Sequence, residues 1–207
     1  MSLFTSIRQS CRGWPALLYL AILGYFAYVG YRQYLDPLGY NSWFAPLNLC
    51  IHEGGHLLMR QLGNELLHVA GGTALQLAAP IISMFILLRH GEAFGIPFCL
   101  GWLSTNLIGV GVYMADARAC ELPLVTAEGG DGSDTIRDWT WLFGHFGLLH
   151  LDTTIGYWTR ALGSATMVLA LLVGVLMLLL AAFPPRYVSP ETKRQDAADR
   201  KHQRRVP

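Results

Sequence analysis

Two histidines and a glutamate occur within five residues, in the stretch "HEGGH" at positions 52–56. On an α-helix, residues four apart lie on one face, so His52 and His56 can present two imidazole nitrogens to one metal ion at about 2.0–2.1 Å. Glu53 lies about 100° around such a helix, where it can reach a water molecule on the metal without being a ligand. The spacing predicts a zinc site with a glutamate as general base.

A catalytic zinc ion has three protein ligands and one open position, so a further ligand is required. Asp116 is one candidate, because it lies at the end of an apolar run where a carboxylate needs a partner. The loop that follows offers four more candidates, which are Asp138, His145, His150 and Asp152. The residue types alone leave the choice open.

The composition indicates which elements must position these residues. The chain has 207 residues, of which 53% are hydrophobic and 14% charged, and this is too apolar for an ordinary soluble domain. Five apolar runs approach the roughly 20 residues that cross a bilayer core of about 30 Å. They are 14–33, 43–62, 70–89, 94–114 and 162–183. We therefore expect an all-α, polytopic transmembrane helix bundle with about five spans, forming a single domain over 1–183.

The second apolar run contains the "HEGGH" stretch near its middle. An ionisable group in the middle of a span costs about 2.5 kcal/mol or more on insertion scales, so such groups are by default functional. Purely structural hydrogen bonding between helices is the alternative. Gly54 and Gly55 either admit a close substrate or pack against another helix.

Two uncharged polar side chains, Gln76 and Asn106, lie inside later apolar runs. Gln76 follows Gly71 and Gly72, which either open a bent segment that lines a cavity or simply begin a helix. Asn106 either supports a metal ligand or substrate, or bonds between helices. Both residues are therefore candidates for supporting the site.

The long polar loop, 115–161, is expected to contain a short interfacial helix over 138–151. In the second half of this loop, 137–152, Asp138, His145 and Asp152 recur every seven residues, so a continuous helix would place them on one face. This stripe either faces solvent or lies near the metal.

The segment 184–207 is basic and is expected to be a disordered cytoplasmic tail. Five spans would then place the N-terminus outside, although Arg8 and Arg12 favour the inside. A net charge of +1 argues against nucleic acid as a partner. The apolar runs indicate that the lipid bilayer surrounds the protein. No pattern indicates an oligomeric state.

Four stretches resemble the site-2 protease family of intramembrane zinc metallopeptidases, and in particular its small bacterial members. They are "HEGGH", "GGTALQLAAP" at 71–80, "NLIGVGVYMADARACELPL" at 106–124 and "RDW" at 137–139. The resemblance implies a bacterial plasma (inner) membrane protein with an H-E-x-x-H helix and an aspartate ligand on a later span. Carried over, His52 and His56 are ligands, Glu53 is the base and Asp116 is the aspartate.

Two positions depart from the family's pattern. "MADAR" around Asp116 is not the family's short L-D-G motif, whereas "HLDTT" at 150–154 contains a Leu-Asp pair, which keeps Asp152 as a candidate. In the small bacterial members a histidine often precedes the Asp-Trp pair, and here that position is Arg137, which argues against a metal role for this loop.

The leading hypothesis is a zinc-dependent membrane endopeptidase that cleaves peptide bonds of a membrane-protein substrate in or near the bilayer. The alternative is a non-proteolytic integral membrane protein that binds or carries a metal. A carrier should have ionisable groups along several spans, whereas here they gather on one predicted helix plus Asp116. A third hypothesis, purely structural histidines, predicts no stoichiometric zinc.

Overall fold

The chain folds entirely into helices over the part that the structure describes. The computed structural model describes residues 14–36, 42–122 and 137–182. Within these ranges there are six α-helices and one 3₁₀ helix, with no strand. The predicted all-α class is therefore confirmed. The predicted tail over 184–207 lies outside the described residues.

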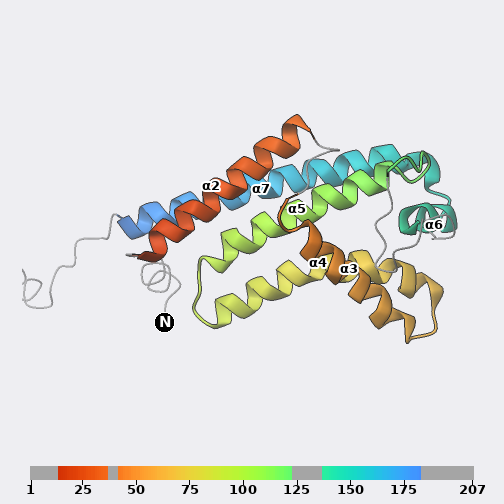
Figure 1. Cartoon of the computed structure of the whole chain (residues 1–207), viewed down its shortest axis with the longest axis horizontal. Coiled ribbons are helices and arrows are strands. Elements are labelled where there is room, and N and C mark those ends of the chain that lie inside the picture. The colour runs from red at the N-terminus through yellow and green to blue at the C-terminus, as the bar shows by residue number, and fades with distance from the viewer. Residues whose placement is uncertain (1–13, 37–41, 123–136, 183–207) are drawn as a thin grey trace, which may run out of the picture.

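The helices form a long bundle, and their order fixes where the candidate site lies (Figure 1). Their bounds are α2 Trp14–Leu35, α3 Ala45–Arg60, α4 Glu65–Arg89, α5 Gly95–Ala115, α6 Asp138–His145, η1 Leu149–Leu151 and α7 Asp152–Ala182. Helix α5 packs between α4 and α7, α3 packs on α4, and α2 runs along α7. Helix α6 contacts α4 and α5 at the end of the bundle where α5 finishes.

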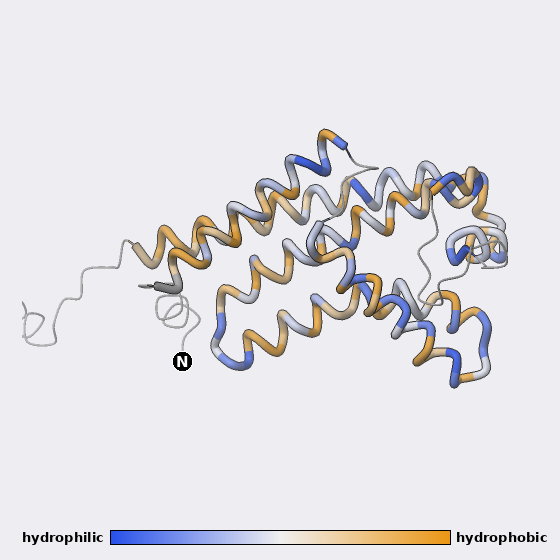
Figure 2. Tube along the Cα trace, viewed as in Figure 1, coloured by the Kyte–Doolittle hydropathy of each residue, from blue (hydrophilic) through white to orange (hydrophobic). Residues whose placement is uncertain are grey.

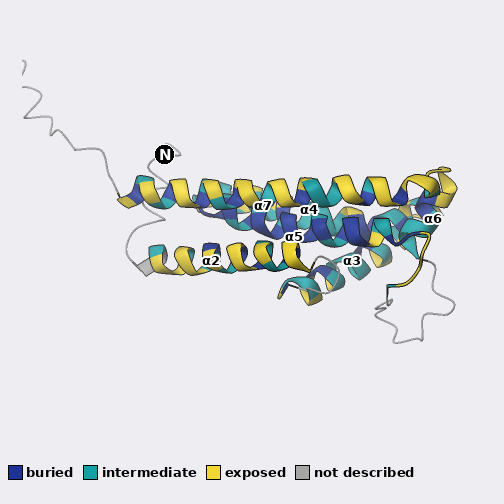
Figure 3. Cartoon of the chain, turned by 90° about the horizontal axis from the view of Figure 1, so that it is seen from above, coloured by how far each residue is buried: buried dark blue, intermediate teal, exposed yellow. Residues whose placement is uncertain are grey.

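Among the described residues, three helical segments are long and apolar enough to cross a membrane, namely α4, α5 and the η1–α7 segment. Helix α5 is central, since 67% of its most apolar window is buried, against 22% and 28% for the other two (Figure 3). Figure 2 shows apolar residues along these helices and hydrophilic ones at the turn between α4 and α5. The exposed apolar faces indicate an integral membrane protein.

The prediction of five spans is not confirmed. Helix α3 has 16 residues, which at about 1.5 Å per residue gives a length of about 24 Å, less than a hydrocarbon core of about 30 Å. Helix α2 has 22 residues, but five tyrosines together with Arg32 and Gln33 lower its apolar character. Neither is among the three membrane-length segments of the described chain.

A tight turn places α3 against α4. Gly63 has a φ of +64°, and the side chain of Asn64 accepts a hydrogen bond of 3.0 Å from the backbone N–H of Leu67, which caps α4. A Cβ atom on Gly55 would collide with the backbone carbonyl of Gly71. The small residues therefore let the two helix backbones approach closely, as in the packing interpretation of the glycine pair.

The helix predicted over 138–151 is interrupted. Helix α6 ends at His145, Gly147 follows with a φ of +68°, and α7 starts only at Asp152. A left-handed residue cannot continue a right-handed helix. The prediction that Asp138, His145 and Asp152 share one helical face is therefore wrong.

Candidate metal centre

Three metal-binding atoms converge where α3, α4 and α6 meet. The Nε2 atoms of His52 and His56 lie 2.9 Å apart. The Oδ2 atom of Asp138 lies 2.9 Å from Nε2 of His52 and 3.1 Å from Nε2 of His56. In a tetrahedral site with zinc bonds of about 2.0–2.1 Å, ligand atoms are about 3.3 Å apart. The triangle is a few tenths of an ångström tighter, so a small outward shift would accommodate one ion.

The far nitrogen of each histidine has its own hydrogen-bond acceptor. Nδ1 of His52 lies 3.0 Å from the side-chain oxygen of Gln76, and Nδ1 of His56 lies 2.8 Å from the backbone carbonyl of His68. Nδ1 of His56 faces a carbonyl oxygen and therefore carries a proton, and the Nε2 atoms of both histidines face the Asp138 oxygen. Each Nε2 can donate a proton to Asp138 or, once deprotonated, bind a metal ion, and histidines that bind metals are typically held at the other ring nitrogen in this way.

Helix α5 contacts the site through Asn106, in a hydrogen bond between helices, which was the alternative to a direct bond with a metal ligand or substrate. The amide nitrogen of Gln76 donates a hydrogen bond of 2.9 Å to the side-chain oxygen of Asn106, which is completely buried. Because this nitrogen is the donor, the oxygen of Gln76 is directed toward His52. The buried chain from Asn106 to His52 fixes the orientation of the imidazole ring.

Gly72 leaves room beside the two imidazoles. A Cβ atom built on Gly72 would contact Nε2 of His56 and would lie 2.7 Å from Nε2 of His52. These contacts place it in the space between the two ligand nitrogens. A side chain at position 72 would therefore displace the two ligand nitrogens, and the imidazole and carboxylate donors suit zinc.

Asp138 is the first residue of α6, where the positive end of the helix dipole favours a negative charge. Burial of this carboxylate opposes its ionisation, but hydrogen bonds and charge interactions with His52 and His56 outweigh burial and hold the pKa of Asp138 below its ordinary value. The site therefore contains a carboxylate that stays ionised at neutral pH.

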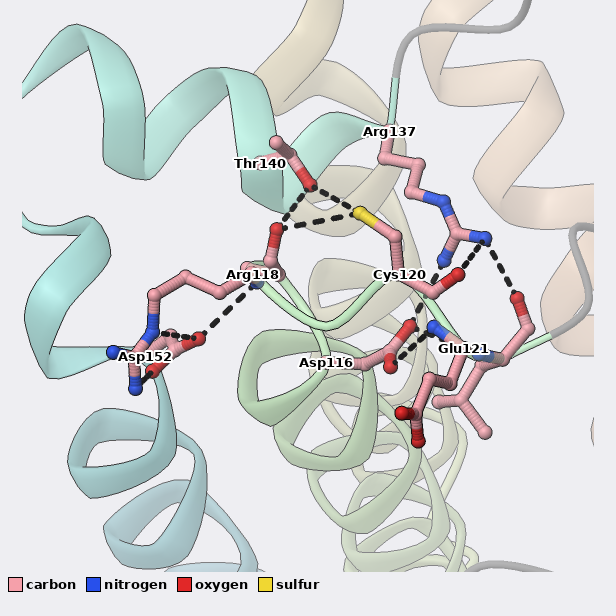
Figure 4. A network of polar contacts seen from close by, with 9 residues as sticks. Asp116, Arg118, Cys120, Glu121, Arg137, Thr140 and Asp152 are labelled. Carbon is pink, nitrogen blue, oxygen red and sulfur yellow. Dashed lines mark hydrogen bonds and ion pairs between the residues drawn. The ribbon is translucent and has the colours of Figure 1, made fainter. Parts of the chain in front are cut away.

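Asp116, the aspartate that the resemblance assigned to the metal, is engaged elsewhere (Figure 4). Its Oδ1 accepts 2.9 Å from the backbone N–H of Glu121, and its Oδ2 accepts 3.1 Å from that of Leu122 and 2.9 Å from Arg137. The carboxylate is thus satisfied by an arginine and two amides. Asp116 does not belong to the converging group, and Asp138 takes the corresponding place.

The other three candidates also lie outside the converging group. Asp152 is buried and pairs with Arg118, with Oδ1 2.7 Å from the guanidinium. His145 stacks on Trp141, with ring centroids 4.9 Å apart, and His150 is exposed in η1. Of the described aspartates and histidines, only Asp138 joins His52 and His56 in a metal-binding geometry.

Glu53 is partly buried beside the first histidine and is close enough for its charge to act on His56. Within the described ranges no hydrogen bond or ion pair holds its carboxylate. A carboxylate without a protein partner is available to accept a proton from water.

A further support of α3 was missed from the sequence. Asn48, four residues before His52 and buried, accepts a hydrogen bond of 2.7 Å from the indole N–H of Trp102 on α5. The sequence contained a signal for Asn48, because a polar residue four positions before His52 lies on the same face of the helix. The sequence contained no signal for the hydrogen bond to His68, because every residue has a backbone carbonyl that could accept it.

Comparisons with protein-family models, with curated proteins and with solved structures gave no match to this chain.

Proposed function

We propose that the protein is a zinc-dependent membrane endopeptidase that hydrolyses peptide bonds in or near the bilayer. In this proposal His52, His56 and Asp138 hold the zinc ion, and Glu53 is the general base. The observation that carries the proposal is the convergence of three metal-binding atoms next to a glutamate whose carboxylate has no partner in the described chain.

The chain's own residues would divide the work in the following way. A bound zinc ion supplies a Lewis acid that polarises the scissile carbonyl and makes water more acidic. Glu53 accepts a proton from the attacking water and later delivers it to the leaving amine nitrogen. Gln76 and the His68 carbonyl keep the protons of the imidazoles on Nδ1, which leaves Nε2 free to bind metal.

The position of the site supports a substrate within the membrane. Gln76 lies eleven residues after Glu65, so it is about 16 Å along α4 from the start of that helix. Since α4 is long and apolar enough to cross a bilayer, a site at this depth would face peptide segments inside it. The resemblance to small bacterial site-2 proteases agrees with this substrate class and implies a bacterial plasma membrane location.

A metal-carrying function has less support from the arrangement of charges. Helix α5, the most buried of the membrane-length helices, contains no Asp, Glu, Lys, Arg or His. A carrier would need ionisable groups along its route. The ionisable groups of the site lie on α3 and α6 and do not form a route across the membrane. This arrangement favours a metal ion that stays in one place.

The proposal is tested by replacing Glu53 with Gln. We expect cleavage of membrane-spanning model peptides in lipid vesicles to fall at least about 100-fold, because general-base catalysis typically contributes that much. Bound zinc should stay near the wild-type level, since Glu53 is not a ligand in the proposal. Zinc-loaded Glu53→Gln protein that still cleaves would contradict the mechanism. Zinc-loaded wild-type protein that cleaves none of the peptides would favour the non-proteolytic alternative.

A further inference from the structure

Asp116 and Arg137 form a partly buried ion pair that joins α6 to the turn after α5 (Figure 4). Asp116 ends α5, and its side chain is only 9% exposed. Its two oxygens accept from the backbone N–H groups of Glu121 and Leu122, which closes the turn around the carboxylate. Arg137 then donates to the same carboxylate from the other chain segment.

The guanidinium of Arg137 is held at more than one point. Nη1 donates 2.9 Å to Asp116, while Nη2 donates 2.9 Å to the carbonyl of Cys120 and 2.9 Å to that of Leu122. A planar guanidinium with several fixed acceptors has one orientation, which a lysine ammonium could not reproduce. The backbone of Arg137 is therefore fixed where α6 begins.

A second contact holds α6 one turn later. The hydroxyl of Thr140 donates 2.6 Å to the carbonyl of Ala117 in the same turn. Because residues three apart lie on neighbouring positions of a helix face, Arg137 and Thr140 together fix both the position and the rotation of the start of α6. Asp138 lies between them and is thereby held facing His52 and His56.

We propose that the Asp116–Arg137 pair is the positioning element that presents Asp138 to the metal. This inference rests on the proposed zinc site. It gives Asp116 a role one step removed from the ion, since its carboxylate acts through Arg137 rather than as a ligand. It also explains why an arginine precedes the Asp-Trp pair: a side chain with several donors is needed to join the turn.

A second ion pair in the same turn offers a matched control. Arg118 donates to Asp152 from its backbone N–H at 3.2 Å and from Nε at 2.9 Å, and Asp152 is 1% exposed. This pair holds the start of α7 rather than α6. Asp116→Asn and Asp152→Asn are therefore the same chemical change at two buried, arginine-paired positions of one turn.

The test is the zinc affinity of the full chain in detergent, measured by competition with a chelator. Residues that orient metal ligands typically change affinity by 10–100-fold, so we expect a loss of about that size for Asp116→Asn. Thr140→Val, a milder change, should lose about threefold or more for the same reason. Asp152→Asn should stay within about twofold of wild type. Circular dichroism measures helical content and identifies variants that do not fold. If Asp116→Asn does not fold, the zinc affinity of Thr140→Val decides whether the inference holds.

The outcomes separate this inference from the proposed function. The inference is overturned if Asp116→Asn and Thr140→Val bind zinc as wild type does while Asp138→Ala does not, and the zinc site would then stand. It is also overturned if Asp152→Asn loses as much affinity as Asp116→Asn, because the effect would then be general loosening of the turn. A wild-type chain that binds no zinc, or an Asp138→Ala chain that binds it normally, would overturn both proposals.

Discussion

At the scale of single residues, the candidate site depends on what lies behind each ligand. The Nδ1 atoms of His52 and His56 are both engaged, so the orientations of the two imidazole rings are fixed before any metal binds. Preorganisation of this kind lowers the conformational entropy lost when a ligand set closes around an ion. The absence of a side chain at Gly72 keeps α4 from colliding with the two ligand nitrogens.

Replacing Gly72 with Ala should abolish stoichiometric zinc binding without unfolding the chain. The new methyl group would lie 2.7 Å from Nε2 of His52 and would contact His56, in the space between the ligands. Alanine has a higher helix propensity than glycine by about 1 kcal/mol, so α4 itself should remain helical. Zinc titration and circular dichroism measure the two effects.

The matched control is Gly54→Ala on α3, since a Cβ there would have no atom within 4 Å. That variant should bind zinc within about twofold of wild type. Wild-type affinity in Gly72→Ala would show that the ion does not lie between the two imidazoles.

At the scale of elements, a buried hydrogen bond from Trp102 to Asn48 fixes the rotation of α3 about its own axis. The bond lies one helical turn before His52, so it bears directly on which face of α3 meets α4. The small-residue contact between Gly55 and Gly71 adds the close approach of the two helices.

Asn48→Leu should lower the free energy of unfolding by about 1–3 kcal/mol, because it leaves the buried indole N–H of Trp102 without an acceptor. Denaturant unfolding in detergent measures the change. Cys50→Ala, at an exposed position of the same helix, should change stability much less. Equal losses in the two variants would show that the bond does not anchor α3.

At the scale of the whole molecule, the features that the sequence predicted are those that depend only on residues close together along the chain. Two histidines four residues apart on one helix face, and long apolar helices, follow from local geometry and composition. The count of five spans is not confirmed, because the length of an apolar run alone does not distinguish α3, with its 16 residues, from a crossing helix.

The third ligand could not be chosen from the sequence for a physical reason. Asp138 is 86 residues from His52, and the start of α6 is held near His52 by the contacts of Arg137 and Thr140 with the turn after α5. Asp116 looked equally suitable, since a buried carboxylate needs a partner. Its partner is a guanidinium instead of a metal, and that pairing depends on tertiary structure.

The central claim is that one zinc ion is held by His52, His56 and Asp138, and X-ray absorption at the zinc edge tests it most directly. Wild-type protein that is loaded with zinc and then dialysed should retain one ion per chain, with imidazole and oxygen ligands at about 2.0–2.1 Å. His52→Ala should lose the ion or one imidazole from the spectrum. Failure to retain stoichiometric zinc, or a spectrum without imidazole that His52→Ala leaves unchanged, would contradict the account.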